Sequence, residues 1–288
     1  MNYAIYFVAV GDSAIKCLKL AYHSLRKAGF AGDVYIFTDG TDIPFKTSAN
    51  TRVARIKEED LNLDPLSTAP MAACDVRRFN KATISENKYH SFNKWAIANM
   101  RTLVDSYIPF EKYDYILYLD VDVLVRGPAQ RFEKFMEQHR GVILLSTAKD
   151  SRRLGGRGNF SLKKLRRAKT TEAANLITWE LLKYWFVQPI CSDIVCFPTD
   201  ELGKRFLREW RVECQKGIYQ DQAALHAILL RYFKNNYVLT PYSIFGYGPK
   251  HYQYEKDKKL EEVNSVFIHF GGAIKDSTAF EKYAKHYL

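Results

Sequence analysis

The segment YDYILYLDVDVLV (residues 113–125) decides the fold class. It begins as a short apolar run rich in aromatic and branched side chains, a pattern typical of a buried strand. Asp120 and Asp122 follow where this strand is expected to end. If the backbone stays extended there, alternation of side chains places both carboxylates on one face. The segment therefore predicts a buried strand that carries two carboxylates at its end.

Outward from this strand, strand-like and helix-like patterns alternate along the chain. A strand is expected at 3–10, and then a helix with its apolar positions on one face from Ile15 to Leu25. Such alternation predicts an α/β fold, with a parallel sheet covered by helices on both faces, in a single domain. The other expected strands are 33–38, 52–56, 141–146, 189–197 and 263–270, and the other expected helices are 90–106, 171–187, 201–215, 221–232 and 277–287.

Length and charge restrict the classes of protein that need to be considered. A chain of 288 residues can bury a core without disulfides, and its five cysteines are expected to be buried thiols. Its formal net charge of +11 indicates an anionic partner. No apolar run is long enough to span a bilayer, and residues 1–10 do not have the pattern of a signal peptide. These features favour a cytoplasmic protein.

The two aspartates suggest a metal site. Two buried carboxylates repel each other, and a divalent cation such as Mn²⁺ or Mg²⁺ removes that repulsion. Near the end of the sequence, His269 closes an expected strand and could complete the metal site, and Lys275 could neutralise a phosphate. Each assignment has an alternative without a ligand. The two aspartates could stand at a solvated strand end, His269 could be a histidine of the core, and Lys275 could be a surface lysine.

Three segments resemble one known family. Residues 116–127 (ILYLDVDVLVRG) are similar to the DxD segment of GT-A-fold, family 8-like glycosyltransferases, such as glycogenin and bacterial lipopolysaccharide galactosyl- and glucosyltransferases. Residues 266–275 (VFIHFGGAIK) resemble the family's His-x-x-Gly-x-x-Lys segment, although the Pro-Trp that follows in the family is replaced here. Residues 219–222 (YQDQ) resemble its Tyr-x-Asp-Gln segment. The resemblance implies a single Rossmann-like GT-A domain, α/β with a mixed, mostly parallel sheet flanked by helices. Its nucleotide-binding half would be 1–125, and its acceptor-binding and metal-completing half 126–288.

The same resemblance implies a reaction and a role for particular residues. The reaction is metal-dependent transfer of a hexose from a UDP-sugar to a saccharide or a lipid-linked, lipopolysaccharide-type acceptor, with retention of configuration. Asp120, Asp122 and His269 would hold Mn²⁺ or Mg²⁺, and Asp221 and Gln222 would lie beside the reacting sugar. The donor-binding residues would be Ala9, Val10, Asp12, Lys94, Asp120, Gly271, Gly272 and Lys275.

One segment departs from the family pattern. Residues 189–197 (PICSDIVCF) stand where the family has Phe-Asn-Ser-Gly or Phe-Asn-Ala-Gly, so Ser192 and Asp193 replace the expected residues. Asp193 is a candidate catalytic residue: it could bind the sugar or the acceptor, or serve as a nucleophile. It could also stand in a turn at the end of a strand.

The segment Arg152–Lys169 holds eight basic residues, no acidic residue and a single aromatic one. Its composition alone fits either a solvated loop or peripheral contact with the inner face of an anionic membrane. The family resemblance implies that this region contacts the acceptor, which would then be phosphorylated or membrane-held. Nucleic-acid binding is not expected, because interleaved aromatic residues are missing. Three alternatives to an active transferase stay open: a non-enzymatic basic module that binds anionic lipid or nucleic acid, a sugar nucleotidyltransferase, and a transferase that has lost its activity.

Overall fold

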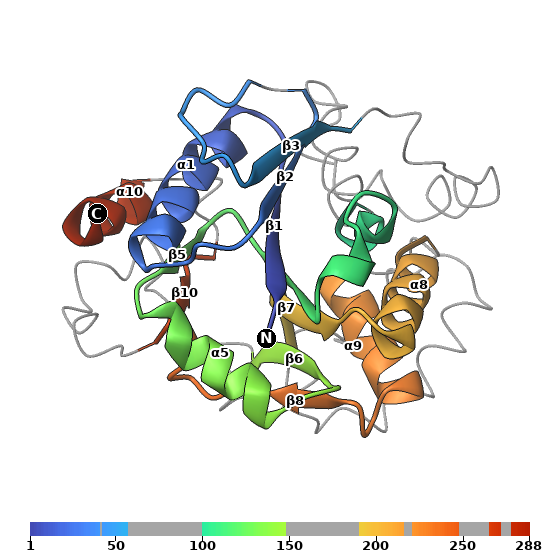
Figure 1. Ribbon diagram of the computed structural model, residues 1–288. Helices are drawn as coiled ribbons and strands as arrows, with labels where there is room; N and C mark the ends of the chain where they lie inside the picture. Colours follow the sequence, from blue (N-terminus) through green and yellow to red (C-terminus); the bar gives the residue numbers. More distant parts are fainter. Residues whose placement is uncertain (41, 57–99, 148–189, 216–220, 248–264, 272–277) are drawn as a thin grey trace, which may run out of the picture.

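The computed structural model describes residues 1–40, 42–56, 100–147, 190–215, 221–247, 265–271 and 278–288 (Figure 1). Their centre is a sheet whose strands lie in the order β3 (Thr51–Arg55), β2 (Val34–Thr38), β1 (Tyr3–Ala9), β4 (Tyr115–Leu119), β7 (Ile190–Pro198), β6 (Ile143–Thr147) and β8 (Tyr237–Leu239). Within this sheet β7 runs antiparallel to both of its neighbours, and the other described pairs are parallel. The mixed, mostly parallel sheet predicted from the sequence is confirmed.

Helices cover both faces of the sheet. On one face lie α1 (Asp12–Lys27), α5 (Ala129–Gln138) and α10 (Thr278–Tyr287), and on the other lie α8 (Glu201–Gln215) and α9 (Asp221–Tyr232) (Figure 1). Strand β1 shows why both faces are buried. Its odd-numbered side chains, such as Phe7, belong to the core beneath α1, and its even-numbered ones, such as Tyr6, belong to the core beneath α8 and α9. A strand buried on both faces has this continuous apolar sequence.

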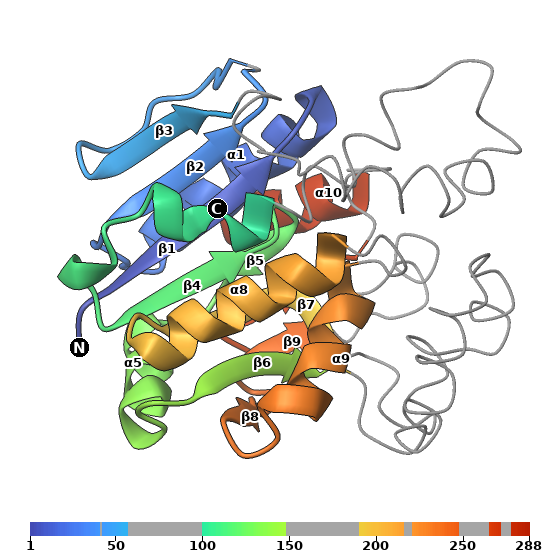
Figure 2. The same ribbon diagram turned by 90° about the vertical axis from the view of Figure 1, so that its right-hand side faces the viewer.

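A smaller sheet adjoins the first on the α1 side. It consists of β5 (Val123–Val125), β10 (Phe267–His269) and β9 (Phe245–Tyr247), in that order. Strand β10 is antiparallel to β5 and parallel to β9. The chain thus passes from the large sheet at Leu119 into the small sheet at Val123, and a turn between them holds both aspartates. Figure 2 shows β4 and β5 following each other in this way.

The turn corrects one expectation from the sequence. Residues 120–122 do not continue the strand: the backbone N–H of Val123 donates to the carbonyl oxygen of Asp120 at 3.1 Å. The two carboxylates therefore approach each other because the chain bends, and not because side chains alternate. The helix expected over 90–106 is described only from residue 100, and it gives way to the 3₁₀ turn η2 (Val104–Ser106). The helix expected over 171–187 lies outside the described residues.

Other expectations agree closely with the described elements. Helices α8 and α9 have the predicted bounds, whereas β10 is shorter than the predicted strand. The sequence patterns did not separate α5, β8 and β9 from the residues around them. The cysteines in the described ranges are buried free thiols. No helix in those ranges is both long enough and apolar enough to span a bilayer.

The start of α8 shows how tightly the helices pack on the sheet. Oδ1 of Asp200 accepts hydrogen bonds from the backbone N–H groups of Leu202 and Gly203, and so caps the helix. A Cβ atom on Gly203 would lie 1.6 Å from the carbonyl oxygen of Pro198, the last residue of β7. Only glycine fits this contact without a shift of the helix relative to the strand.

We expect Gly203→Ala to lower the free energy of unfolding by about 1–3 kcal/mol, because an extra methyl group would force the helix off the sheet. Glycine-to-alanine changes inside exposed helices have the opposite sign, with a gain of about 1 kcal/mol. Urea unfolding of the wild type and the variant measures the difference. Lys204→Ala, at the next and solvent-facing position, is the control; a Gly203→Ala variant as stable as the wild type would contradict the contact.

Candidate metal centre

The candidate metal centre is built from the turn between the two sheets and the end of β10. Asp120 directly follows β4, Asp122 directly precedes β5, and His269 is the last residue of β10. Backbone hydrogen bonds hold the turn from two sides. The N–H of Asp120 donates to the carbonyl oxygen of Asp193 in β7 at 2.8 Å, and the N–H of Phe270 donates to the carbonyl oxygen of Asp122 at 2.9 Å.

The three side chains converge on one point. One ligand atom from each of Asp120, Asp122 and His269 lies within 4.8 Å of the others. Nε2 of His269 is 3.2 Å from Oδ1 of Asp122, and this buried oxygen accepts no well-formed hydrogen bond from the described residues. Buried polar atoms normally have partners, so such an oxygen points to a ligand of the protein. The chemistry of the three groups fits a divalent cation.

A buried arginine holds the first of these carboxylates. The guanidinium of Arg101 lies over the ring of Tyr118 and donates from Nη2 to Oδ1 of Asp120 at 2.9 Å. Nη1 of Arg101 also lies 3.4 Å from Oγ of Ser192. The Tyr118 hydroxyl donates a second hydrogen bond to Oδ1 of Asp120. Sequence reasoning had pointed to Lys94 and missed Arg101. The available signal was spacing: seven residues, or two helical turns, separate these cations on one expected helix.

The pKa values of the group reflect buried charges in close contact. Burial is the main reason that the pKa of Asp120 rises to about 7; the carboxylates of Asp193 and Asp122 contribute to this increase, and Arg101 opposes it. Burial would lower the pKa of His269, but Asp193 and Asp122 hold it well above its usual value. The centre therefore attracts positive charge, which protons supply when no cation is bound.

Strand β7 and helix α9 bring three more polar side chains to this region. Oδ2 of Asp193 lies 2.7 Å from Nδ1 of His269, and the Cys191 thiol donates to the same oxygen at 2.7 Å. The Cys191 sulfur is also 3.5 Å from Oε1 of Gln222, near the start of α9. His269 pulls the pKa of Asp193 below its usual value against the effect of burial. The sequence-predicted residues Asp193 and Gln222 are therefore connected to the metal centre through side-chain contacts.

Other predicted residues lie at the same edge of the sheet or outside the described ranges. Strands β1 and β4 are parallel neighbours, so Ala9 and Val10 lie at the carboxyl end that also carries Asp120. Asp12 is the exposed first residue of α1. A Cβ on Gly271 would lie 3.2 Å from Cε1 of His269. Outside the described residues, or without a described side chain, are Lys94, Asp221, Gly272, Lys275 and the basic segment Arg152–Lys169.

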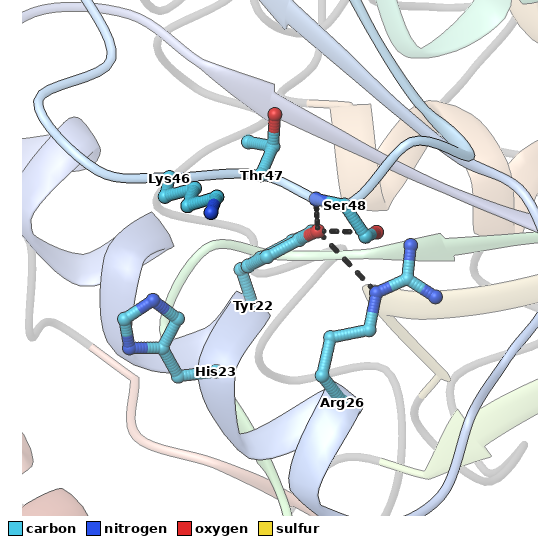
Figure 3. A pocket seen from close by; sticks show the side chains of 6 residues that line it. All are labelled: Tyr22, His23, Arg26, Lys46, Thr47 and Ser48. Atoms are coloured by element: carbon cyan, nitrogen blue, oxygen red, sulfur yellow. Dashed lines mark hydrogen bonds between the residues drawn. The ribbon is translucent and has the colours of Figure 1, made fainter.

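A surface pocket lies elsewhere, between α1 and the segment that leads into β3 (Figure 3). The guanidinium of Arg26 donates there to the carbonyl oxygens of Phe30 and Gly32 and to the side chain of Asn50, so it ties the helix to the loops around it. These residues stand at the amino end of β3, opposite to the carboxyl edge that holds the aspartates. The pocket is lined by Tyr22, His23, Arg26, Lys46, Thr47 and Ser48.

Comparisons with known proteins give matches in structure. No family model and no curated protein matches the sequence. A crystal structure of the galactosyltransferase LgtC in complex with donor and acceptor sugar analogues is 16% identical and has a TM-score of 0.58; the match covers 99% of this chain and 96% of LgtC. An active-site mutant of LgtC gives 16% identity and a TM-score of 0.57, over 98% and 95% of the two chains.

A third structure comes from a different transferase. Mouse xyloside xylosyltransferase 1 in its apo form has a TM-score of 0.54 and 11% identity, with 95% of this chain and 99% of that chain covered. Identities of this size establish an architecture, and an activity has to be argued from the site. The chain has the GT-A fold of the glycosyltransferases, in agreement with the resemblance read from its sequence.

Proposed function

We propose that this protein is a metal-dependent glycosyltransferase that moves a hexose from a UDP-sugar to a saccharide or lipid-linked acceptor. The observation that carries the proposal is the buried group of Asp120, Asp122 and His269 at the carboxyl edge of a GT-A sheet. Ligands bind at this edge in open α/β sheets. A basic binding module leaves the buried carboxylates without a role, and a nucleotidyltransferase is not favoured by the fold matches.

The metal ligands are Asp120, Asp122 and His269. When bound, a divalent cation neutralises negative charge on the diphosphate of the donor and on the departing UDP. The protein's own contribution is to hold its ligands in place before the donor arrives: Arg101 and Tyr118 fix Asp120, and the backbone of β10 fixes His269. A charged site that is already arranged needs little reorganisation when charge develops.

The donor would extend from the metal along the edge of the sheet. We assign Ala9, Val10 and Asp12 to the uracil and ribose, because they lie at the carboxyl end of β1 beside β4. Asp120 would also contact the ribose. Diphosphate contacts by Lys94, Gly271, Gly272 and Lys275 rest on the family resemblance.

Residues at the start of α9, close to the candidate metal centre, would face the reacting sugar. Gln222 is half-buried, and its Oε1 lies 3.5 Å from the Cys191 sulfur, so it is within reach of the β7 side chains. Its carbonyl dipole could stabilise positive charge at the anomeric carbon, and Asp221 could hold sugar hydroxyls. Retention of configuration rests on the resemblance, and a nucleophilic role of Asp193 stays a prediction.

The acceptor and location are assigned from the sequence alone. The basic segment Arg152–Lys169 is proposed to meet a phosphorylated or membrane-held acceptor at the inner face of an anionic membrane. A cytoplasmic enzyme of polysaccharide biosynthesis fits this assignment.

The first test is calorimetric titration of UDP into the protein with Mn²⁺ and with chelator. We expect UDP binding that requires the metal and that weakens at least about 10-fold in Asp122→Asn, because the negative charge of this ligand is lost. Asp114→Asn is the matched control, since Asp114 precedes the opposite end of β4 and accepts a hydrogen bond from the backbone N–H of Asn2. If UDP binds under none of these conditions, the UDP-donor proposal is wrong. If UDP binds as expected, screening UDP-sugars for hydrolysis identifies the sugar.

Removing the amide of Gln222 should affect the chemical step. We expect Gln222→Ala to lower kcat for UDP-sugar hydrolysis by about 100-fold, the size seen when one aligned dipole is removed from an active site, with Mn²⁺ affinity unchanged. Gln138→Ala, at the exposed end of α5, is the control. Equal rates for Gln222→Ala and the wild type would remove Gln222 from the reaction.

Metal binding should depend on pH in a defined direction. The pKa of Asp120 is about 7 in the folded metal-free protein and about 4 when unfolded, so its ionisation reduces stability as the pH rises between these values. A cation must displace this proton below about pH 7 and need not above it. We therefore expect the increase in Tm caused by Mn²⁺ to be larger at about pH 8 than at about pH 6. Thermal unfolding with Mn²⁺ or with chelator measures it, and an equal increase at both values contradicts the assignment of Asp120 as a ligand.

A further inference from the structure

The imidazole of His269 lies between two carboxylates. Its Nε2 is 3.2 Å from Oδ1 of Asp122, and its Nδ1 is 2.7 Å from Oδ2 of Asp193. The side chains are nearly buried, with 10% of His269 and 11% of Asp193 exposed. Asp122 belongs to the group that forms the candidate metal centre with Asp120 and His269, whereas Asp193 does not. The two ring nitrogens therefore face different environments.

A neutral imidazole carries one N–H, and a metal ligand must present the other nitrogen with its lone pair free. A carboxylate close to Nδ1 favours the N–H there and leaves Nε2 as the ligand atom. Asp193 occupies that position, whereas Nε2 faces the ligand oxygen of Asp122. Which nitrogen faces the metal is thus determined by the residue behind the ring.

The Asp193 carboxylate is itself held in place. The Cys191 thiol donates to Oδ2 at 2.7 Å, and the carbonyl oxygen of Asp193 accepts the N–H of Asp120 at 2.8 Å. Strand β7 therefore supports Asp120 through the backbone of Asp193 and His269 through the side chain of the same residue. A carboxylate engaged in this way is better suited to orienting a ring than to attacking a sugar carbon.

We propose that Asp193 is a positioning residue that accepts the Nδ1 proton of His269 and so presents Nε2 to the divalent cation. This inference deepens the proposed function and rests on it. Asp193 acts through His269 and does not contact the metal. Supporting residues of this kind change the affinity for a metal by about 10–100-fold when they are removed.

The test is a titration of Mn²⁺ followed by electron paramagnetic resonance, which detects the free ion without substrate or turnover. The proteins compared are the wild type, Asp193→Ala, Asp193→Asn and the control Asp114→Asn. Both variants at 193 lose the charge, but only alanine loses the oxygen that would accept the Nδ1 proton, so their difference isolates the proposed hydrogen bond. We expect Asp193→Ala to weaken Mn²⁺ binding about 10–100-fold, Asp193→Asn to weaken it clearly less, and the control to bind as the wild type does.

A spectroscopic measurement on the wild type tests the proposal even if the Asp193→Ala variant folds poorly. Long-range ¹H–¹⁵N spectra of the Mg²⁺-loaded wild type should show Nδ1 of His269 protonated and Nε2 without a proton, and Asp193→Asn should keep this tautomer. A proton on Nε2, or equal Mn²⁺ affinities for wild type and Asp193→Ala, overturns the positioning role while the metal site stands. Equal losses for Asp193→Ala and Asp193→Asn overturn it too. A wild type that binds no Mn²⁺ overturns the proposed function as well, so the two failures are distinguishable.

Discussion

Two backbone hydrogen bonds at the turn between β4 and β5 determine the arrangement of the site. One joins Asp120 to Asp193 of β7, and the other joins Phe270, just after β10, to Asp122. Strands β4 and β5 follow each other in the sequence but belong to different sheets. The turn between them is the point where the chain passes from the large sheet to the small one. Because the backbone is fixed from both sides, the carboxylates are held close together despite their repulsion.

The architecture was readable from the sequence where apolar runs and helical periods are long. Strand β4 was predicted because its apolar residues stand together, and α9 because polar residues and turns bound a clear apolar pattern. The direction of β7 was not readable, since strands of either direction buried on both faces have similar composition. The short strands β8 and β9 were missed because three residues give no period.

The sequence predicted which residues form the candidate site, but not how the chain brings them together. Asp120, Asp122 and His269 were identified from chemistry and resemblance, and the structure brings them together. Their mutual approach depends on a turn that side-chain alternation does not describe. Arg101 was missed because a buried cation looks like a solvated one until its partner Asp120 is placed in space. Tertiary contacts, and not local sequence, determine which charge is buried.

The pairing of β5 with β10 joins residues that are far apart in the sequence, and this has a consequence during synthesis. A ribosome that has made the chain as far as β9 has produced both aspartates but not the imidazole. Contacts between such distant segments form late, because closing a long loop costs chain entropy. The nascent polypeptide therefore lacks its complete set of ligands until β10 has emerged and docked. Capture of a cation by the full ligand set thus reports that translation has passed β10 and that its strand has paired.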